Sequence, residues 1–171
     1  MKNLKFVSRV ALCGVLMLSL NACALFKKKN KYAGMSDSDM VNGAPLPERQ
    51  EGVSFTGSNV DRSKFSPVHF GYDSVSVEPG ETGKLDTVAK FIKSSDKMLI
   101  IAGFTDERGT AEYNRGLGER RAQAVRTYLL QKGADTERIQ TTSFGSEMPA
   151  DTGHDESAWA KNRRAEFGVT K

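Results

Sequence analysis

Cysteine and histidine are scarce in this chain, which has two of each among its 171 residues. Cys13 and Cys23 cannot form a disulfide scaffold for a protein of this length, because such scaffolds are short and dense in cysteine. His69 and His154 leave little material for a metal centre of imidazole and thiolate ligands. Neither common type of glycine-rich phosphate loop is present. The sequence therefore predicts neither a metal site nor a cofactor.

A long hydrophobic run is also missing. The longest one, Val10–Leu20, has eleven residues, whereas a helix that crosses a hydrocarbon core of ~30 Å needs about 20. Overall, 38% of the residues are hydrophobic and 27% are charged, which is ordinary for a globular protein. This composition argues against a polytopic membrane protein, a collagen and a fully disordered chain. The length predicts one domain with appendages.

An excess of charge of one sign is absent from the part of the chain that is long enough to fold. The net charge is +4, but residues 1–22 contribute +3, residues 24–64 contribute +2, and residues 65–171, with 15 basic and 16 acidic residues, contribute −1. A nucleic-acid-binding domain concentrates basic residues on its folded surface. The near-neutral balance therefore argues against nucleic acid as a partner.

Residues 1–22 are typical of a secretory signal peptide. Three basic residues and no acid precede the apolar run: Lys2, Lys5 and Arg9. The run itself has the length of a signal h-region. The following Leu20-Asn21-Ala22-Cys23 resembles a bacterial lipobox, which implies cleavage before Cys23 and lipidation of that residue. Several acyl chains on one residue bind a membrane stably. By resemblance to the sorting rules of Gram-negative lipoproteins, Ala24 in place of an aspartate after the cysteine implies sorting to the outer membrane. An ordinary signal peptide, cleaved near Ala22 or Ala24, is the alternative.

Residues 23–64, the lipidated cysteine and the segment after it, are predicted to form a flexible tether. From Met35 to Asn59 the segment is rich in Gly, Ser, Asp, Asn and Pro, with neither helical nor strand periodicity. This is the composition of a linker. Four lysines follow the cysteine closely, at positions 27, 28, 29 and 31. They either lie on anionic headgroups or form a solvated charge run.

Residues 65–171 alternate strand and helix patterns. Strand patterns occur at 67–72, 98–102, 138–144 and 164–169, and helix patterns occur at 78–94, 111–132 and 156–162. In the first helix, apolar residues recur at i, i+3, i+4 and i+7 as Leu85, Val88, Ala89 and Ile92. Gly133 is a typical residue to end the second helix. The order β-α-β-α-β-(α)-β predicts an α+β fold, a two-layer αβ sandwich with one modest core.

The candidate site lies where the second strand pattern meets the long helix. A charged loop, Thr105–Thr110, leaves the end of an apolar strand, which is where αβ folds place their ligands. On the helix, Arg121 falls in the middle of the apolar stripe that includes Leu117. Because a guanidinium keeps its charge, an apolar setting is costly unless an anion from the protein or from a ligand meets it.

Asp106, at the end of the strand, is the obvious neighbour for Arg121. Together the two residues would suit a zwitterion, with an ammonium on Asp106 and a carboxylate held bidentate by Arg121. A plain ion pair that joins the loop to the helix is the alternative. The residues alone leave both interpretations open.

Several stretches resemble the OmpA C-terminal-like family, and its peptidoglycan-associated lipoproteins in particular. Gly103–Asn114 is similar to the family signature, and Phe70–Ser74 and Trp159–Arg164 are similar to its first strand and closing motif. The long helix fits the family pattern N-x-x-L-[SG]-x-x-R-A, with its fixed positions at Asn114, Leu117, Gly118, Arg121 and Ala122. Phe104 stands where the lipoprotein branch usually has histidine. The resemblance covers residues 65–171.

This resemblance implies non-covalent binding of peptidoglycan. In the family, the residues that match Asp106 and Arg121 hold the diaminopimelate of the stem peptide, whose side chain ends in an ammonium and a carboxylate. By the same resemblance, four further residues contribute to the pocket: Tyr72, Asp73, Thr110 and Leu117. Three more would support the pocket without holding the guest. Asn114 would fix the loop, and Asn162 and Arg163 would either support the site or have a structural role.

The implied protein is an outer-membrane lipoprotein, not an enzyme, whose folded domain lies in the periplasm and links the membrane to the cell wall. Periplasmic Tol proteins are implied as further partners, in envelope integrity and cell division. A cell-wall hydrolase is the alternative, but its best acid–base pair, Asp73 and Asp106, lies near Arg121, which would keep a carboxylate ionised. A stator relative would need a membrane-spanning segment, and the tether contains none.

Overall fold

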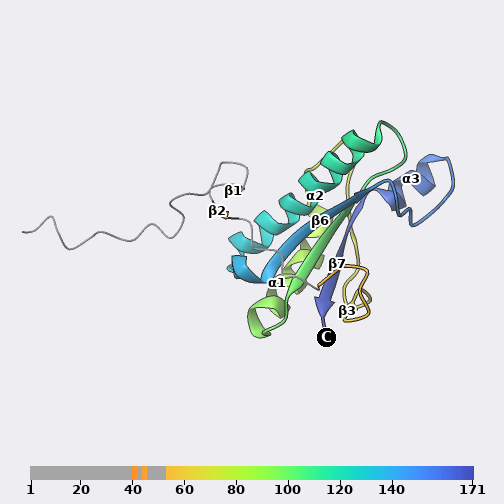
Figure 1. Cartoon of the computed structure of the whole chain (residues 1–171). Helices are drawn as coiled ribbons and strands as arrows, with labels where there is room; N and C mark the ends of the chain where they lie inside the picture. Colours follow the sequence, from red (N-terminus) through yellow and green to blue (C-terminus); the bar gives the residue numbers. More distant parts are fainter. Residues whose placement is uncertain (1–39, 42–43, 46–52) are drawn as a thin grey trace, which may run out of the picture. The chain divides into compact units, whose positions relative to one another are not determined.

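The computed structural model describes residues 40–41, 44–45 and 53–171. The predicted signal peptide, Cys23 and most of the predicted tether lie outside these residues, and so do their predicted roles. β1 (Met40–Val41) and β2 (Ala44–Pro45) form an antiparallel pair of their own. The other elements build a larger sheet and the helices around it (Figure 1).

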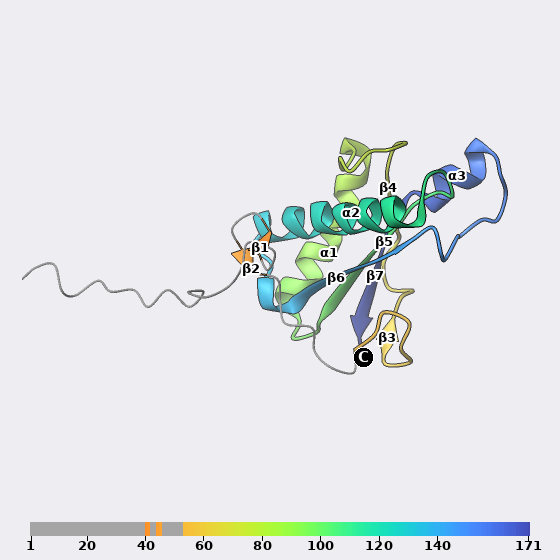
Figure 2. The same ribbon diagram turned by 45° about the horizontal axis from the view of Figure 1, so that its top comes forward.

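Five strands form the larger sheet, in the order β3-β7-β5-β6, with β4 also paired to β7. Their bounds are β3 (Val60–Asp61), β4 (Val68–His69), β5 (Leu99–Phe104), β6 (Ile139–Gly145) and β7 (Arg164–Thr170). β5 runs parallel to β6 and antiparallel to β7. β3 and β4 pair with opposite ends of β7. The carboxyl ends of β5 and β6 therefore meet at one end of the sheet (Figure 2).

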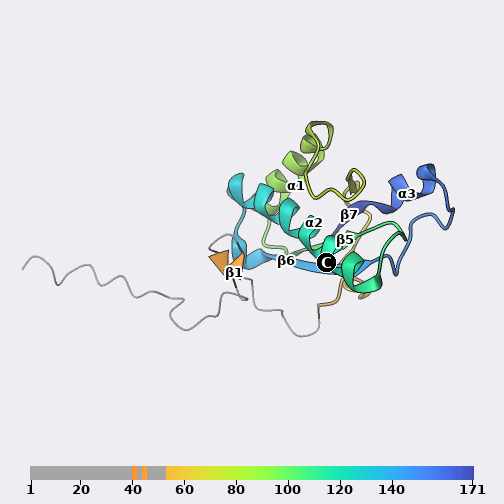
Figure 3. The same cartoon turned by 90° about the horizontal axis from the view of Figure 1, so that it is seen from above.

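Two helices cover one face of this sheet. They are α1 (Thr82–Ser94), which follows a short 3-10 turn, η2 (Pro79–Glu81), and α2 (Ala111–Gln131) (Figure 3). The predicted apolar face of α1 is buried in full, at Leu85, Val88, Ala89 and Ile92. It packs with Val125 and Leu129 of α2 and with Phe167 of β7. Gly133, with φ of 87°, takes the left-handed conformation that ends α2 as expected.

A second, smaller cluster covers the other face. Phe55 and Val60 pack there against Ile100, Ala102 and Phe104, which explains why all six residues of β5 are buried. Gly168 makes this approach possible, because a Cβ at that position would lie 2.6 Å from Val60. The expectation that the folded part begins at residue 65 is therefore corrected: residues 53–64 belong to it. Single apolar residues separated by polar ones and glycine show no periodicity, which is why composition assigned them to the tether.

A close approach of two glycines joins α2 to β5. A Cβ on Gly103 of β5 would lie 1.9 Å from the carbonyl oxygen of Gly118 in α2. The backbones of strand and helix can approach this closely only because neither residue has a side chain. The contact places the first turns of α2 directly beside the carboxyl end of β5, where the charged loop begins.

The remaining elements complete an α+β fold. η3 (Thr136–Arg138) precedes β6, and α3 (Glu156–Asn162) precedes β7, within the bounds expected for the third helix. One expected strand is wrong in extent: β4 has two residues instead of the six at 67–72, and Tyr72, at the end of that pattern, is 64% exposed. The chain turns away after Phe70 to form a loop. Among the residues that the structure describes, no helix combines the length and the apolar character needed to cross a membrane.

Candidate functional site

The loop after β5 carries a buried carboxylate. Asp106 is 5% exposed, and its Oδ2 lies 2.6 Å from Nη2 of Arg108 and 3.4 Å from Nη1 of Arg163. Its Oδ1 accepts a hydrogen bond of 3.2 Å from the backbone N–H of Arg108. Burial alone would raise the pKa of Asp106, but the hydrogen bonds from Arg108, with a smaller contribution from Arg163, leave this pKa below its usual value. The carboxylate is therefore ionised at neutral pH.

Helix α2 presents Leu117 and Arg121 beside this loop. Thr110 caps the helix, since its hydroxyl accepts a hydrogen bond from the N–H of Tyr113. Leu117 is buried at 5% exposure and Arg121 is fully buried, as their positions on the apolar stripe predicted. The glycine contact between α2 and β5 sets how near the two side chains lie to Asp106.

The guanidinium of Arg121 is held mainly by backbone carbonyls. Its Nε donates to Ser74 O at 2.9 Å, Nη1 to Phe104 O at 2.8 Å and Nη2 to Gly71 O at 3.1 Å. Within the described part of the chain, Arg121 and Asp106 form no direct ion pair, so the alternative of a plain structural pair is not what the structure contains. An anion was expected to meet the buried guanidinium of Arg121, but three neutral carbonyl oxygens accept its hydrogen bonds instead.

The negative charge of Asp106 nevertheless acts on Arg121. Burial lowers the pKa of Arg121 to about 10, and the negative charge of Asp106 works in the opposite direction. The guanidinium remains charged at neutral pH. A guanidinium has five N–H groups and three of them donate to carbonyls, which leaves one N–H on each terminal nitrogen for another acceptor.

A cavity of about 200 Å³ lies between these groups. Ten residues line it: Tyr72, Asp73, Thr105, Asp106, Arg108, Gly109, Tyr113, Asn114, Leu117 and Arg121. Two aspartates and two arginines are the ionisable groups of opposite charge in this lining. The cavity thus offers both a carboxylate and a guanidinium to a single small guest, as the zwitterion interpretation requires.

The loop after β4 forms one wall of the cavity. Asp73 has φ of 48°, a left-handed conformation that aspartate tolerates better than most residues. The hydroxyl of Tyr113 donates a hydrogen bond to the Asp73 carboxylate, and this bond raises the pKa of Tyr113. The loop is therefore tied to the first turn of α2.

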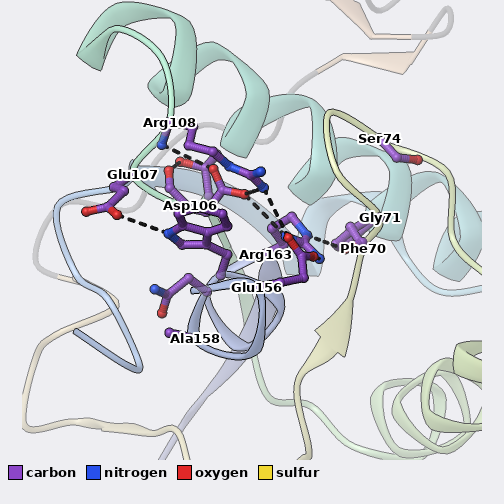
Figure 4. A network of polar contacts seen from close by, with 12 residues as sticks. Phe70, Gly71, Ser74, Asp106, Glu107, Arg108, Glu156, Ala158 and Arg163 are labelled. Atoms are coloured by element: carbon purple, nitrogen blue, oxygen red, sulfur yellow. Dashed lines mark hydrogen bonds and ion pairs between the residues drawn. The ribbon is translucent and has the colours of Figure 1, made fainter. Parts of the chain in front are cut away.

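Two of the three expected supporting residues make structural contacts. Arg163 donates from Nε to Phe70 O at 3.1 Å and pairs through Nη2 with Glu156 Oε1 at 2.7 Å, in addition to its contact with Asp106 (Figure 4). Asn162 accepts hydrogen bonds from the N–H groups of Ala150 and Asp151. Arg163 thus helps to hold the carboxylate of Asp106 in place, and Asn162 holds the loop before α3.

Asn114 occupies a different place from the one expected. It is 1% exposed and lines the cavity, yet its Nδ2 has no hydrogen-bond partner in the described structure. It was expected to fix the loop, and a side-chain bond of that kind is absent among the described residues. This unpartnered Nδ2 lies beside Gly109, where a Cβ would come within 3.9 Å of it.

The structure brings most of the expected site residues together and adds others. Five of the six expected pocket residues line the cavity, namely Tyr72, Asp73, Asp106, Leu117 and Arg121, whereas Thr110 is not in the lining and acts as the helix cap. Four lining residues were not predicted: Thr105, Arg108, Gly109 and Tyr113. Three of these belong to the charged loop that drew attention to the site, so the loop itself was the available signal.

A metal site would need several ligating side chains close together. No group of three or more histidine, cysteine, aspartate or glutamate side chains that could hold a metal ion occurs in the described ranges. His154 instead pairs with Glu107, its Nδ1 lying 2.7 Å from Oε1.

Comparison with known proteins gives concordant matches. The sequence profile of the OmpA family matches residues 69–163. The peptidoglycan-associated lipoprotein of Pseudomonas aeruginosa is 39% identical over 140 residues, which cover 78% of this chain and 83% of the relative. That of Haemophilus influenzae is 35% identical over 162 residues, which cover 94% of this chain and 96% of the relative.

Solved structures show the same fold. The crystal structure of the peptidoglycan-associated lipoprotein from Burkholderia pseudomallei superposes with a TM-score of 0.60 at 42% identity, covering 61% of this chain and 89% of that one. The C-terminal domain of Helicobacter pylori MotB has a TM-score of 0.58 at 23% identity, covering 63% of this chain and 85% of that one. At that identity the second likeness concerns the fold alone.

Proposed function

Because this chain belongs to the OmpA family and, within it, to the peptidoglycan-associated lipoproteins, we propose that it binds peptidoglycan non-covalently through the cavity between β5 and α2. The guest is the diaminopimelate of a stem peptide, which carries an ammonium and a carboxylate at the end of its side chain. The protein thereby links the outer membrane to the cell wall. The names of its relatives support this, since they describe association with peptidoglycan.

One observation carries the proposal: the same cavity is lined by the ionised carboxylate of Asp106 and by a guanidinium with two uncommitted N–H groups. Terminal N–H groups of one guanidinium are suited to a bidentate carboxylate. A carboxylate at 5% exposure is suited to an ammonium, because charge pairs are stronger where water is excluded. Leu117 supplies an apolar wall for the methylene groups between the two charges.

A sacculus pull-down tests the proposal. Asp106→Asn keeps the shape of the side chain and removes its charge, so it should reduce binding to isolated sacculi at least tenfold, in line with the loss of a desolvated charge pair. Arg121→Ala should lose binding as well, but it also leaves three carbonyls without a donor, so its folding is measured by circular dichroism before its binding is interpreted.

Asp86→Asn is the matched control for Asp106→Asn. Asp86 is an ion-paired aspartate too, 2.9 Å from Nζ of Lys132, but it lies on α1 and is not in the cavity lining. It should bind sacculi like the unaltered protein. Full binding by a folded Asp106→Asn protein would overturn the proposal.

The lipid anchor is a second part of the proposed function. Lipidation of Cys23, with outer-membrane sorting by Ala24, would hold the folded domain in the periplasm at the end of the segment that follows. Cys23→Ser should therefore move the protein from the membrane fraction to the soluble periplasmic fraction on cell fractionation. Retention of this variant in the membrane fraction would contradict the anchor.

Docking to periplasmic Tol proteins, in a system for envelope integrity and cell division, is the further role that family membership supports. Co-purification of the tagged protein with Tol proteins from detergent-solubilised envelopes tests it. A hydrolase is not favoured, because the pKa of Asp106 lies below its usual value and a general acid needs a pKa near the working pH. Incubation with sacculi should accordingly release no fragments.

A further inference from the structure

Arg108 lines the cavity, but the proposed function gives it no role in binding the guest. Its Cζ lies 4.1 Å from the ring centroid of Tyr72 and 4.1 Å from that of Trp159. A guanidinium this close to two aromatic faces is attracted by both. Tyr72 belongs to the loop after β4 and Trp159 to α3, so Arg108 joins the cavity lining to both of these segments.

Arg108 also meets the carboxylate that the proposed guest needs. Its Nη2 lies 2.6 Å from Oδ2 of Asp106, and 3.9 Å from Oε2 of Glu156 (Figure 4). Its side chain is still 31% exposed, and its Nε is buried without a partner in the described structure. The guanidinium is therefore fixed in place by stacking and pairing at the cavity lining, while its Nε is committed to no other group in the described structure.

The charge of Arg108 balances the cavity. With it, the lining holds two arginines against two aspartates. Without it, the lining would carry a net negative charge and would favour a guest with a single positive charge. In a stem peptide with lysine at its third position, the side chain of that residue ends in an ammonium alone. With diaminopimelate at that position, the side chain ends in the same ammonium plus a carboxylate.

We propose that Arg108 is a specificity residue of this site: held between Tyr72 and Trp159, it adds a second positive charge to the cavity and so favours a side-chain end with a carboxylate over one with an ammonium only. This inference rests on the proposed function. It assigns to Arg108 a share of the carboxylate recognition that Arg121 alone would otherwise supply.

The test compares two synthetic stem peptides that differ in one carboxylate. L-Ala-γ-D-Glu-meso-diaminopimelate-D-Ala and its L-Lys analogue are titrated into the full-length protein and into Arg108→Gln, and the ratio of the two dissociation constants is measured. Because both peptides share the ammonium, this ratio isolates the attraction for the carboxylate, as in a double-mutant cycle. The preference for the diaminopimelate peptide should fall about three- to tenfold in Arg108→Gln, the size of a partly screened charge interaction.

Two further variants separate charge from structure. Arg108→Lys keeps the charge but loses the planar stacking, so it should weaken both peptides while keeping their ratio near that of the unaltered protein. Arg62→Gln removes an arginine that also lies over an aromatic ring, Phe55, at 5.6 Å from its centroid, but outside the cavity lining; it should change neither constant.

The outcomes are distinguishable. If Arg108→Gln weakens both peptides equally, Arg108 supports the cavity only and the specificity role is overturned while peptidoglycan binding stands. If the unaltered protein binds neither peptide, the proposed function fails and this inference falls with it.

Discussion

Arg121 shows what a single side chain can reveal from its place in a sequence pattern. Its position on the apolar stripe of α2 predicted burial, and it is fully buried. Its partners are carbonyls of residues 17 to 50 positions away in the chain. Arg126, also buried and bonded to Thr136, lies outside that stripe and was not predicted. The sequence predicted the burial of Arg121 but not that of Arg126, and it predicted the hydrogen-bond acceptors of neither side chain.

The two histidines should titrate on opposite sides of the usual histidine value. The hydrogen bond that Glu107 accepts raises the pKa of His154 above 6.5, whereas burial, and then the charge of Lys84, lowers the pKa of His69 below 6.5. NMR titration of the ring protons should give two midpoints, one above and one below 6.5. Glu107→Gln should move only the upper midpoint back toward 6.5.

The same shift has a consequence for stability. Because the pKa of His154 is higher in the folded state than the unfolded value of 6.5, its contribution to stability is present below about pH 6.5 and is lost as the pH rises through the folded pKa. A single midpoint shared by both histidines would contradict this description of their surroundings.

At the scale of elements, the contact between α2 and β5 decides whether the site exists. Gly103→Ala would place a Cβ 1.9 Å from a backbone oxygen of α2, so the helix must move away from the strand. We expect a loss of about 3 kcal/mol in the free energy of unfolding, at the upper end for overpacking, together with weaker sacculus binding because Arg121 moves away from Asp106. Urea unfolding measures the first effect.

Gly83→Ala is the matched control for that substitution. Gly83 is exposed near the start of α1, and a Cβ there would meet nothing within 4 Å. Since alanine favours a helix over glycine by about 0.8–1 kcal/mol, this variant should be as stable as the unaltered protein or slightly more so. Equal unfolding curves for Gly103→Ala and Gly83→Ala would show that the glycine contact is not required.

At the scale of the whole molecule, residues 53–64 complete the domain. Phe55 is 3% exposed and its ring lies 5.8 Å from that of Phe144 and 6.3 Å from that of Phe104. A fragment of residues 65–171 should therefore be less stable than one of residues 53–171 by about 3 kcal/mol or more, the cost typical of losing one buried phenylalanine. Urea unfolding of both fragments checks this.

Phe55→Ala in the full-length protein tests the same point without truncation. It should reproduce most of the difference between the two fragments, because the single ring fills the space beside Gly168. If the two fragments unfold at the same urea concentration, the second face of the sheet does not depend on this segment.

Local pattern determined much of this protein. The period of the apolar residues indicated α1 and the apolar stripe of α2 to within a few residues, and α3 spans Glu156–Asn162 as predicted. The charged loop after an apolar strand, together with Arg121 on the helix stripe, pointed to the place where the structure has a cavity. These predictions succeed because helix and strand periodicity are set by neighbours a few residues apart.

Only the tertiary structure decided how the site is held together. Arg108 stacks between rings that come from two distant segments, and Asp106 pairs with Arg108 and Arg163. Residues 53–64 cover a sheet face formed mostly by residues after position 98. Such contacts join residues far apart in the chain, and their geometry follows from how the helices and strands pack, which no local period encodes.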